Sequence, residues 1–348
     1  MPVNRKRPGG FAATSRSIRL NSNKPSAGCP RSLPLRELRQ PPPRIALPAS
    51  APSLPPYFPI SSRLGRRLRR CACRPRCICA SDDWRTAASQ IDLDGILLAL
   101  KPDHQPKIAE QVMKGGLPLF LEKPLALDNE SANRLMQVAR MQGFVGVVDH
   151  LHLFAPEFQE IVRQGRTRGA VRAITSVSGN CGPYRGSWSA CWDWAPHDVA
   201  MALAVMDSFP VSVLARVVAR RRDEGQIFEN IGLTLTFSGG TTANIVTGNA
   251  FDGRRREFSV VIDDLTLSYF DDPDNKRSVV IGRGDGAQLV PVETFPPLKA
   301  ALNEFVARIR QGTGGETDLA LGVNVVWIIS AAERSMHSGV AVPIEPPV

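Results

Sequence analysis

The chain has 348 residues, of which 43% are hydrophobic and 22% are charged, a composition typical of a soluble globular protein with room for two domains. Its formal charge of +10 comes from the first 80 residues, which hold 17 Lys and Arg but one acid, Glu37. The other 268 residues are mildly acidic, which argues against nucleic acid as a partner of the globular part, and no apolar run approaches the roughly 18 residues that would span a bilayer.

Residues 1–80 are predicted to form a disordered basic segment. They contain 14 of the 29 prolines, and such spacing leaves no helical or strand periodicity. Three explanations are open: a stretch read in the wrong frame or from a misassigned start, which we favour, an organellar transit peptide, or a functional basic tail that could bind nucleic acid.

Five of the seven cysteines also lie in this segment, and four of them form the run Cys71-x-Cys73-x3-Cys77-x-Cys79. This spacing is tighter than that of the usual zinc patterns, so no metal site is expected. Only Cys181 and Cys191 belong to the globular part, which gives no disulfide framework and fits a reducing cytoplasm.

From Asp83 onward, strands and helices alternate. Apolar runs predict strands over 95–100, 117–121 and 144–148, and the stretches 106–114 and 129–141 have helical patterns, each followed by glycine. This order predicts a parallel sheet covered by helices. Residues 81–150 are predicted to hold this sheet, and the family resemblance described below implies that they are the remaining half of a Rossmann-like domain whose first half is missing.

Residues 151–348 are predicted to form an α+β domain with a large, mainly antiparallel open sheet. Strand patterns follow one another with short turns, and two helices close the chain. The predicted strands are 171–178, 211–219, 231–237, 241–247, 258–262 and 265–270, and the predicted helices are 298–310 and 319–336. The glycines of 282–286 precede a strand pattern, which favours a hairpin turn over a phosphate-binding loop.

Glu122-Lys123-Pro124 directly follows a predicted buried strand. Parallel sheets bind ligands at the carboxyl ends of their strands, where a lysine could stabilise a developing alkoxide. The alternative is a solvated lysine at the end of a strand.

The segment Trp192-Asp193-Trp194-Ala195-Pro196-His197 precedes an apolar helical pattern, so a helix is expected to begin near Pro196. The four-residue spacing can bring the Asp193 carboxylate and the His197 imidazole to one pocket, where histidine could act as an acid or base. The alternatives are a capping Asp with a surface His, or two metal ligands, for which no third ligand is evident.

Taken together, these motifs resemble the Gfo/Idh/MocA family (glucose-fructose oxidoreductase and inositol dehydrogenase), and the resemblance covers roughly residues 81–346. It rests on Glu122-Lys123-Pro124, on the Asp193-x3-His197 pair and on the closing stretch from Asp318 to Val340. It implies NAD or NADP as cofactor, a sugar, cyclitol or related polyol as substrate, and a homo-oligomer that forms through the large sheet.

By this resemblance, Lys123, Asp193 and His197 are the catalytic residues: the lysine contacts the substrate hydroxyl, Asp193 orients the substrate and His197 is the acid/base. Glu122, Lys123, Pro124 and Pro102 would bind the cofactor. The candidate substrate contacts are His150, His152, Tyr184 and Trp188. Packing within the loop is an equally good explanation for the last two.

The chain also departs from the family pattern. Residues 1–82 contain no Gly-x-Gly-x-x-Gly turn and no acid about 20 positions later for the ribose. Ala200 stands where many relatives have an acid, and Asp198 is its possible replacement. Three functions follow: an oxidoreductase impaired by loss of the phosphate loop, a non-catalytic family member acting through its C-terminal domain, and a basic-tailed protein associated with nucleic acid.

Overall fold

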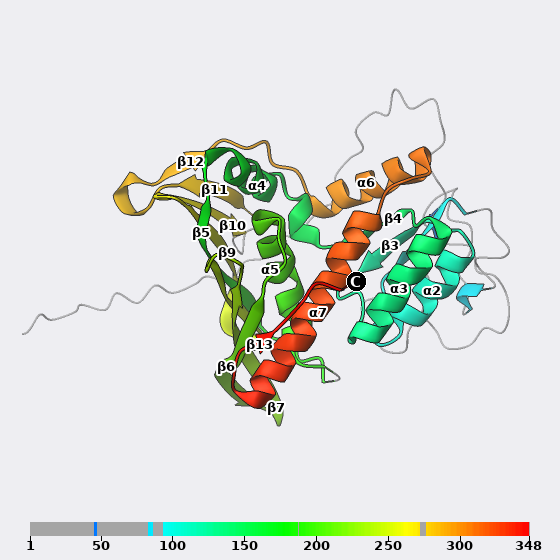
Figure 1. Ribbon diagram of the computed structural model, residues 1–348, viewed down its shortest axis with the longest axis horizontal. Coiled ribbons are helices and arrows are strands. Elements are labelled where there is room, and N and C mark those ends of the chain that lie inside the picture. The colour runs from blue at the N-terminus through cyan, green and yellow to red at the C-terminus, as the bar shows by residue number, and fades with distance from the viewer. Residues whose placement is uncertain (1–44, 47–82, 86–92, 187, 272–275, 348) are drawn as a thin grey trace, which may run out of the picture. The chain divides into compact units, whose positions relative to one another are not determined.

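The computed structural model describes residues 45–46, 83–85, 93–186, 188–271 and 276–347, and the account below concerns this part of the chain (Figure 1). The predicted disordered segment and its cysteine run therefore lie outside the described residues. The exception is β1 (Ile45–Ala46), a two-residue strand that pairs in parallel with Gly95 and Ile96. Regular structure thus occurs at one point where none was expected.

A parallel sheet with strand order β1-β2-β3-β4 forms the first structured part. Its other strands and its helices are β2 (Gly95–Leu98), α2 (Gln105–Lys114), β3 (Leu119–Glu122), α3 (Asn129–Gln142) and β4 (Gly146–Asp149). All neighbouring strands are parallel, which confirms the predicted Rossmann-like arrangement.

Local sequence explains where these elements begin and end. Leu119, Leu121 and Val147 are fully buried, as continuous apolar strands in a covered parallel sheet should be. The Asp128 side chain caps α3 by accepting a hydrogen bond of 2.7 Å from the backbone N–H of Ser131. The same helix ends at Gly143, whose φ of 72° is readily adopted only without a side chain.

The second part is a nine-stranded sheet with order β12-β11-β10-β9-β5-β8-β7-β6-β13, in which only β5 and β8 pair in parallel. The predicted mainly antiparallel sheet is therefore confirmed. Its strands are β5 (Val171–Cys181), β6 (Ser212–Asp223), β7 (Gln226–Thr236), β8 (Thr242–Gly248), β9 (Ala250–Ile262), β10 (Leu265–Asp271), β11 (Arg277–Ile281), β12 (Gln288–Val290) and β13 (Val342–Pro343). The glycines of 282–286 form the turn between β11 and β12, as predicted.

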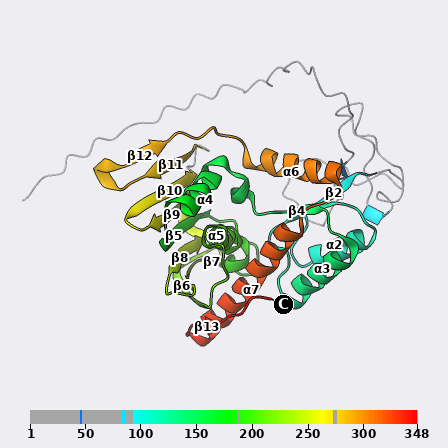
Figure 2. The ribbon, with the colours of Figure 1, turned by 45° about the horizontal axis from the view of Figure 1, so that its top comes forward.

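Helices cover one face of this sheet. In Figure 2, α5 (Ala190–Met206) is seen end-on between the strands and α7 (Glu316–Ser338). α4 (Pro156–Arg168) packs against β9, β10 and β11, while α6 (Pro297–Gln311) packs against β4 and the short helix η1 (Leu151–Phe154). α7 contacts α3, α5 and β6, so that one continuous hydrophobic core joins the two sheets.

The helices differ from the sequence analysis in two places: one begins earlier than expected, and one was not predicted. α5 begins at Ala190, not near Pro196, because burial of almost the whole helix compensates for the hydrogen bond that an internal proline cannot make. α4 was not predicted, although Pro156 at its first position and the spacing of Phe158, Ile161 and Val162 are typical of an amphipathic helix.

α7 is long and apolar enough to cross a membrane by length and composition alone. In the structure, 56% of its most apolar window is buried inside the protein. Its packing against α3, α5 and β6 explains this composition as that of a core helix.

Candidate functional site

Lys123 lies at the carboxyl end of β3, in a turn that hydrogen bonds from a neighbouring helix hold in place. The Gln105 side chain on α2 is buried and donates hydrogen bonds to the backbone oxygens of Glu122 at 2.6 Å and Pro124 at 3.2 Å. The Lys123–Pro124 peptide bond is cis. One buried amide therefore determines the path of the chain on both sides of the lysine.

The structure brings Lys123, Asp193 and His197 to one cleft of about 280 Å³. The Lys123 ammonium donates a hydrogen bond of 2.6 Å to the backbone oxygen of Asp193, 70 residues further along the chain. The other side chains that matter in this cleft are His152, Asn180, Arg185, Trp194, Arg254, Arg256 and Asp271. A lysine at a strand end and a helix-capping aspartate would have no reason to meet in this way.

Two histidines lie edge-to-face in the cleft. The rings of His152 and His197 have centroids 5.1 Å apart and an interplanar angle of 86°. His152 Nδ1 is 3.3 Å from the hydroxyl oxygen of Tyr269, whereas His197 Nδ1 has no hydrogen-bond partner within the described part of the chain. Burial, then the charge of Lys123, holds the pKa of His197 well below its usual range, so this imidazole is neutral.

The charge state of Lys123 is set by opposing effects. Burial lowers its pKa, and the nearby carboxylates of Asp193 and Glu122 raise it. A lysine with a lowered pKa beside a neutral histidine is the kind of perturbed pair that occurs at active sites.

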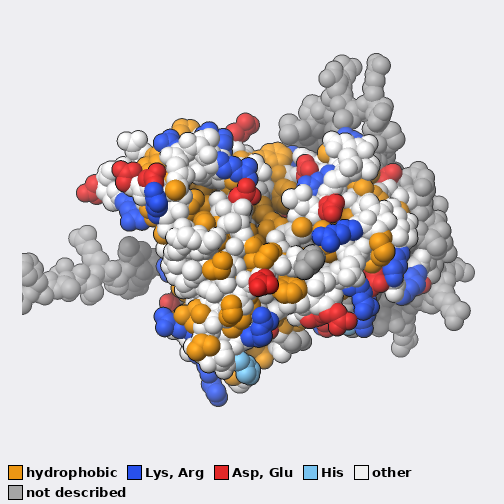
Figure 3. Space-filling model, viewed as in Figure 1, with side chains coloured by type: hydrophobic (Ala, Val, Ile, Leu, Met, Phe, Trp, Pro, Cys, Tyr) orange, Lys and Arg blue, Asp and Glu red, His pale blue; other side chains and the backbone are white. Residues whose placement is uncertain are grey.

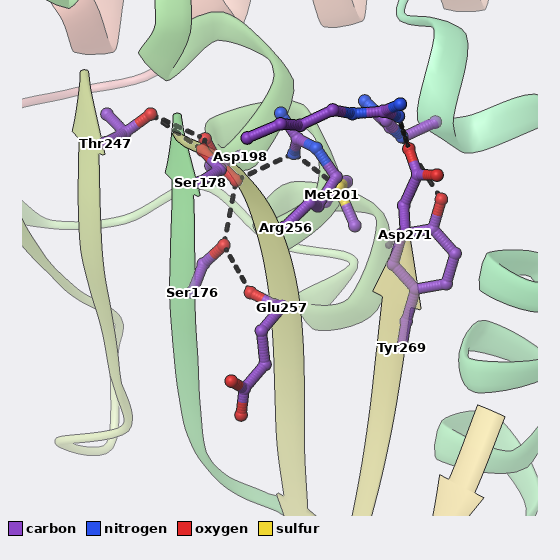
Figure 4. Close-up of polar contacts among 11 residues, drawn as sticks. Ser176, Ser178, Asp198, Met201, Thr247, Arg256, Glu257, Tyr269 and Asp271 are labelled. Carbon is purple, nitrogen blue, oxygen red and sulfur yellow. Dashed lines mark hydrogen bonds and ion pairs between the residues drawn. The ribbon is translucent and has the colours of Figure 1, made fainter. Parts of the chain in front are cut away.

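Below the cleft, Asp198 organises a buried polar network (Figure 4). This fully buried carboxylate accepts hydrogen bonds from Ser176 at 2.8 Å, Ser178 at 2.5 Å and Thr247 at 3.1 Å, and it pairs with the Arg256 guanidinium at 3.0 Å. Asp198 therefore points toward the sheet and anchors an arginine of the cleft. Ala200, where an acid was expected, is buried in the apolar core.

Polar groups also gather at the carboxyl ends of β3 and β4. Burial, then the charge of Glu122, raises the pKa of Asp149 to about 7, and burial lowers that of His150 to about 3. One carboxylate oxygen of Asp149 and both ring nitrogens of His150 have no partner among the described residues. Pro102, which follows β2, is buried near the same edge of the sheet.

The remaining predicted substrate contacts, His152, Tyr184 and Trp188, line two different hollows. His152 lines the cleft, but Tyr184 and Trp188 line an adjoining hollow of about 290 Å³ that shares only Arg185 and Asp193 with it. Tyr184 is 44% exposed and packs on the Phe228 ring, as the loop-packing alternative expected. Within the described ranges, no three His, Cys, Asp or Glu side chains are placed to hold a metal ion.

Sequence reasoning missed the arginines of β9 and their partners. The run Arg254-Arg255-Arg256 is visible in the sequence, but nothing local shows that all three residues line the cleft. Tyr269 and Asp271 on β10 carry no motif at all.

A larger hollow of about 770 Å³ lies between α4, α5 and α7. Figure 3 shows hydrophobic side chains in the recess between these helices. Neither His152 nor His197 lines this larger hollow. The smaller cleft is the candidate active site, because it contains both histidines together with Lys123.

Comparison with known proteins agrees with this geometry. Residues 58–150 match the model of the oxidoreductase family with an NAD-binding Rossmann fold, and residues 157–268 match the C-terminal domain of GFO/IDH/MocA proteins. An oxidoreductase structure from Magnetospirillum magnetotacticum MS-1 is 30% identical over 74% of this chain and 85% of its own, with a TM-score of 0.68. The chain belongs to the Gfo/Idh/MocA family.

Two further relatives are more distant. The chain is 25% identical to UDP-N-acetylglucosamine 3-dehydrogenase from Acidithiobacillus ferrooxidans over 157 residues, and thus spans about half (48%) of the length of that curated relative. A myo-inositol dehydrogenase from Corynebacterium glutamicum shares the fold, with a TM-score of 0.64 and 20% identity over 77% of this chain and 85% of its own. The family match begins at residue 58, 23 residues before the resemblance seen in the sequence.

The residues present fit NAD or NADP, the cofactor of the family. Unpartnered buried polar atoms of Asp149 and His150 at the end of a parallel sheet are the groups that a bound nicotinamide and its ribose can satisfy. The segment that would hold the pyrophosphate lies outside the described residues.

Proposed function

We propose that this protein transfers a hydride between NAD or NADP and a secondary hydroxyl of a sugar, cyclitol or related polyol. The observation that carries this proposal is the meeting of Lys123 and His197 in one cleft at the end of the parallel sheet. The names of the relatives, a UDP-N-acetylglucosamine 3-dehydrogenase and a myo-inositol dehydrogenase, support this substrate class.

In this proposal His197 acts as the base: its unpartnered Nδ1 lies in the cleft that Lys123 also lines, where it can take the hydroxyl proton as the carbon loses its hydride. Lys123 donates a hydrogen bond to the same oxygen and stabilises the developing alkoxide. Asp193 orients the substrate, and its backbone oxygen holds the lysine in place. The cofactor, when bound, supplies the hydride acceptor.

Glu122, Lys123, Pro124 and Pro102 would contact the cofactor, with His150 and Asp149 beside them. His152 would contact the substrate together with His197. Tyr184 and Trp188 would touch only those substrates that extend past Arg185 into the adjoining hollow.

The proposal is tested on the chain with a complete Rossmann half in place of its N-terminal segment, by incubating it with NAD⁺ or NADP⁺ and a panel of sugars and inositols while following the appearance of NAD(P)H. His197→Ala should abolish most of the signal. His337→Ala is the matched control, because His337 is exposed in the last turn of α7 and does not line the cleft. Equal rates in the two variants would contradict the role of His197.

We also propose that this chain binds NAD(P) weakly, because residues 1–82 contain no Gly-x-Gly-x-x-Gly turn. Calorimetric titration should then show no micromolar affinity, and replacing the N-terminal segment with a complete Rossmann half should restore binding. Tight binding by the chain as it stands would contradict this proposal.

A non-catalytic role through the C-terminal domain (151–348) is the second candidate, and it is favoured by the missing glycine turn. Exposed apolar side chains on β6 and β7, including Leu214, Val217, Val218 and Ile227, support a homo-oligomer formed through the large sheet. Light scattering on the purified chain would detect this oligomer.

Free thiols at Cys181 and Cys191 support a cytoplasmic location.

A further inference from the structure

The hydroxyl group of Tyr269 has a single hydrogen-bond partner among the described residues. Tyr269 lies on β10 with its side chain fully buried, and its hydroxyl oxygen is 3.3 Å from Nδ1 of His152. Asp271 projects from the same strand beside it (Figure 4). One carboxylate oxygen of Asp271 binds the Arg254 guanidinium at 2.6 Å, and the other has no partner within the described ranges. The imidazole of His152 is therefore the acceptor that remains for the phenol proton.

The protonation states of both side chains follow from their surroundings. Burial, then the negative charge of Asp271, raises the pKa of Tyr269, so its hydroxyl keeps its proton. Burial, then the positive charge of Arg256, holds the pKa of His152 well below its usual range, so this imidazole is neutral. A neutral imidazole carries one proton, on Nδ1 or on Nε2, and its other nitrogen is an acceptor.

The contact with Tyr269 decides which nitrogen of His152 carries the proton. With the proton on Nε2, Nδ1 accepts the phenol proton, and both groups of the contact are satisfied. With the proton on Nδ1, the buried phenol O–H has no acceptor in the described part of the chain. The unmet hydrogen bond of a buried donor favours the first tautomer by about 5- to 150-fold.

Nε2 of His152 is accessible from the candidate active-site cleft. His152 lines this cleft, and Nε2 makes no hydrogen bond to the described residues. Unlike both ring nitrogens of His150, it is not enclosed by protein atoms. With Tyr269 bound at Nδ1, the ring presents an N–H donor to the cleft, in edge-to-face contact with the ring of His197.

We propose, on the basis of the proposed function, that Tyr269 is a positioning residue that fixes His152 as an N–H donor, and that His152 binds the oxygen on the carbon next to the oxidised one. The reacting oxygen is already shared by His197 and Lys123, and a nitrogen that carries a proton needs an acceptor. Because the two imidazole rings are in contact, with centroids 5.1 Å apart, the oxygens that they reach lie on neighbouring carbons. The substrate is therefore a vicinal diol, and the base is His197 and not His152.

The tautomer can be measured without any substrate. In the ¹⁵N-labelled full chain near neutral pH, long-range ¹H–¹⁵N correlation spectra should show the His152 proton on Nε2, with the signals assigned by their loss in His152→Asn. Tyr269→Phe should increase the fraction of His152 that is protonated on Nδ1. Ser268→Ala is the matched control, because it removes another buried hydroxyl of β10, which bonds to Ser259 and does not line the cleft. A parent chain with the proton on Nδ1, or an unchanged tautomer ratio in Tyr269→Phe, would overturn the proposal.

The role of His152 in binding is measured by kinetics on the chain with a complete Rossmann half. The probes are the sugar or inositol of the panel that is oxidised fastest and its analogue without the hydroxyl on the neighbouring carbon. The deoxy analogue should have a kcat/KM about 10-fold lower or less, because the Nε2–H is left without an acceptor. Tyr269→Phe should raise KM for the parent sugar by about 3- to 10-fold with little change in kcat, and should affect the deoxy analogue less. Ser268→Ala should alter neither constant. Equal kcat/KM values for the two probes, or an equal effect of Tyr269→Phe on both, would overturn the proposal.

The two proposals fail in different ways. If no sugar or inositol is oxidised, the oxidoreductase function falls, and the spectra still decide whether Tyr269 fixes the tautomer of His152. If sugars are oxidised but the deoxy analogue reacts equally well, the oxidoreductase function stands and the role of His152 and Tyr269 falls.

Discussion

Asp198→Ala should destabilise the protein strongly, because it removes the centre of a buried network. The substitution leaves the Arg256 guanidinium without a carboxylate in a place where only 8% of the residue is exposed. Removal of one partner of a buried ion pair reduces stability by about 3–5 kcal/mol, because the remaining charge is left uncompensated.

The three hydroxyls of the network should add little to this loss. Ser178 and Thr247 are 2.8 Å apart and can bond to each other, and Ser176 also donates to the backbone oxygen of Glu257 at 3.2 Å. The expected loss is therefore about 3–5 kcal/mol, a large part of the roughly 5–15 kcal/mol that stabilises an ordinary domain.

The free energy of unfolding can be measured by urea denaturation followed by tryptophan fluorescence. Asp198→Asn, which retains one acceptor oxygen but no charge, should give an intermediate loss of about 1–3 kcal/mol. Arg172→Gln serves as the control: it removes an exposed pair with Asp263 and should change stability by about 0–1 kcal/mol. A loss below about 1 kcal/mol in Asp198→Ala would refute the assignment of this carboxylate as the anchor of Arg256.

Three further predictions concern the histidines and the carboxyl group at the sheet edge. In the chain with a restored N-terminal half, His197→Ala should lower turnover by about 10²- to 10⁴-fold with little change in cofactor affinity, and steady-state kinetics showing full turnover would contradict it. Burial raises the pKa of Asp149 from its usual 3.8 to about 7, so the folded state binds the proton more tightly than the unfolded state and loses stability as pH rises through this range. Asp149→Asn should accordingly be more stable than the parent chain above pH 7, and this difference in the free energy of unfolding should vanish toward pH 4. Urea titrations at both pH values measure it, and a difference that does not change with pH would contradict the reasoning. Tyr269→Phe removes the hydroxyl that contacts His152 and should reduce stability by about 1–3 kcal/mol, whereas Tyr184→Phe, on an exposed ring, should have no effect in the same thermal or urea assay.

The sequence alone was sufficient for the fold class, and it singled out three residues that the structure places in one cleft. Strands β2, β3 and β4 are short apolar runs followed by turn residues, and Gly143 and Gly339 mark helix ends that need left-handed backbone. Lys123, Asp193 and His197 occur in motifs specific enough to indicate a family. These features are local, because each depends on residues within a few positions of one another.

Helix boundaries depended on packing that the sequence does not show. Pro196 normally argues for the start of a helix, yet α5 begins at Ala190 because its burial between the large sheet and α7 stabilises the first two turns. The amphipathic pattern of α4 was present in the sequence and was missed.

The charge environment of the cleft was decided only by tertiary structure. Arg254, Arg256 and Asp271 lie on β9 and β10, and they meet Lys123 only because α7 packs the two sheets around one hydrophobic core. The same long-range packing buries Asp149 and raises its pKa, since desolvation depends on every neighbour in space. Periodicity and motifs depend on residues that are close along the chain, whereas electrostatic energies depend on the distances between charges in the folded protein.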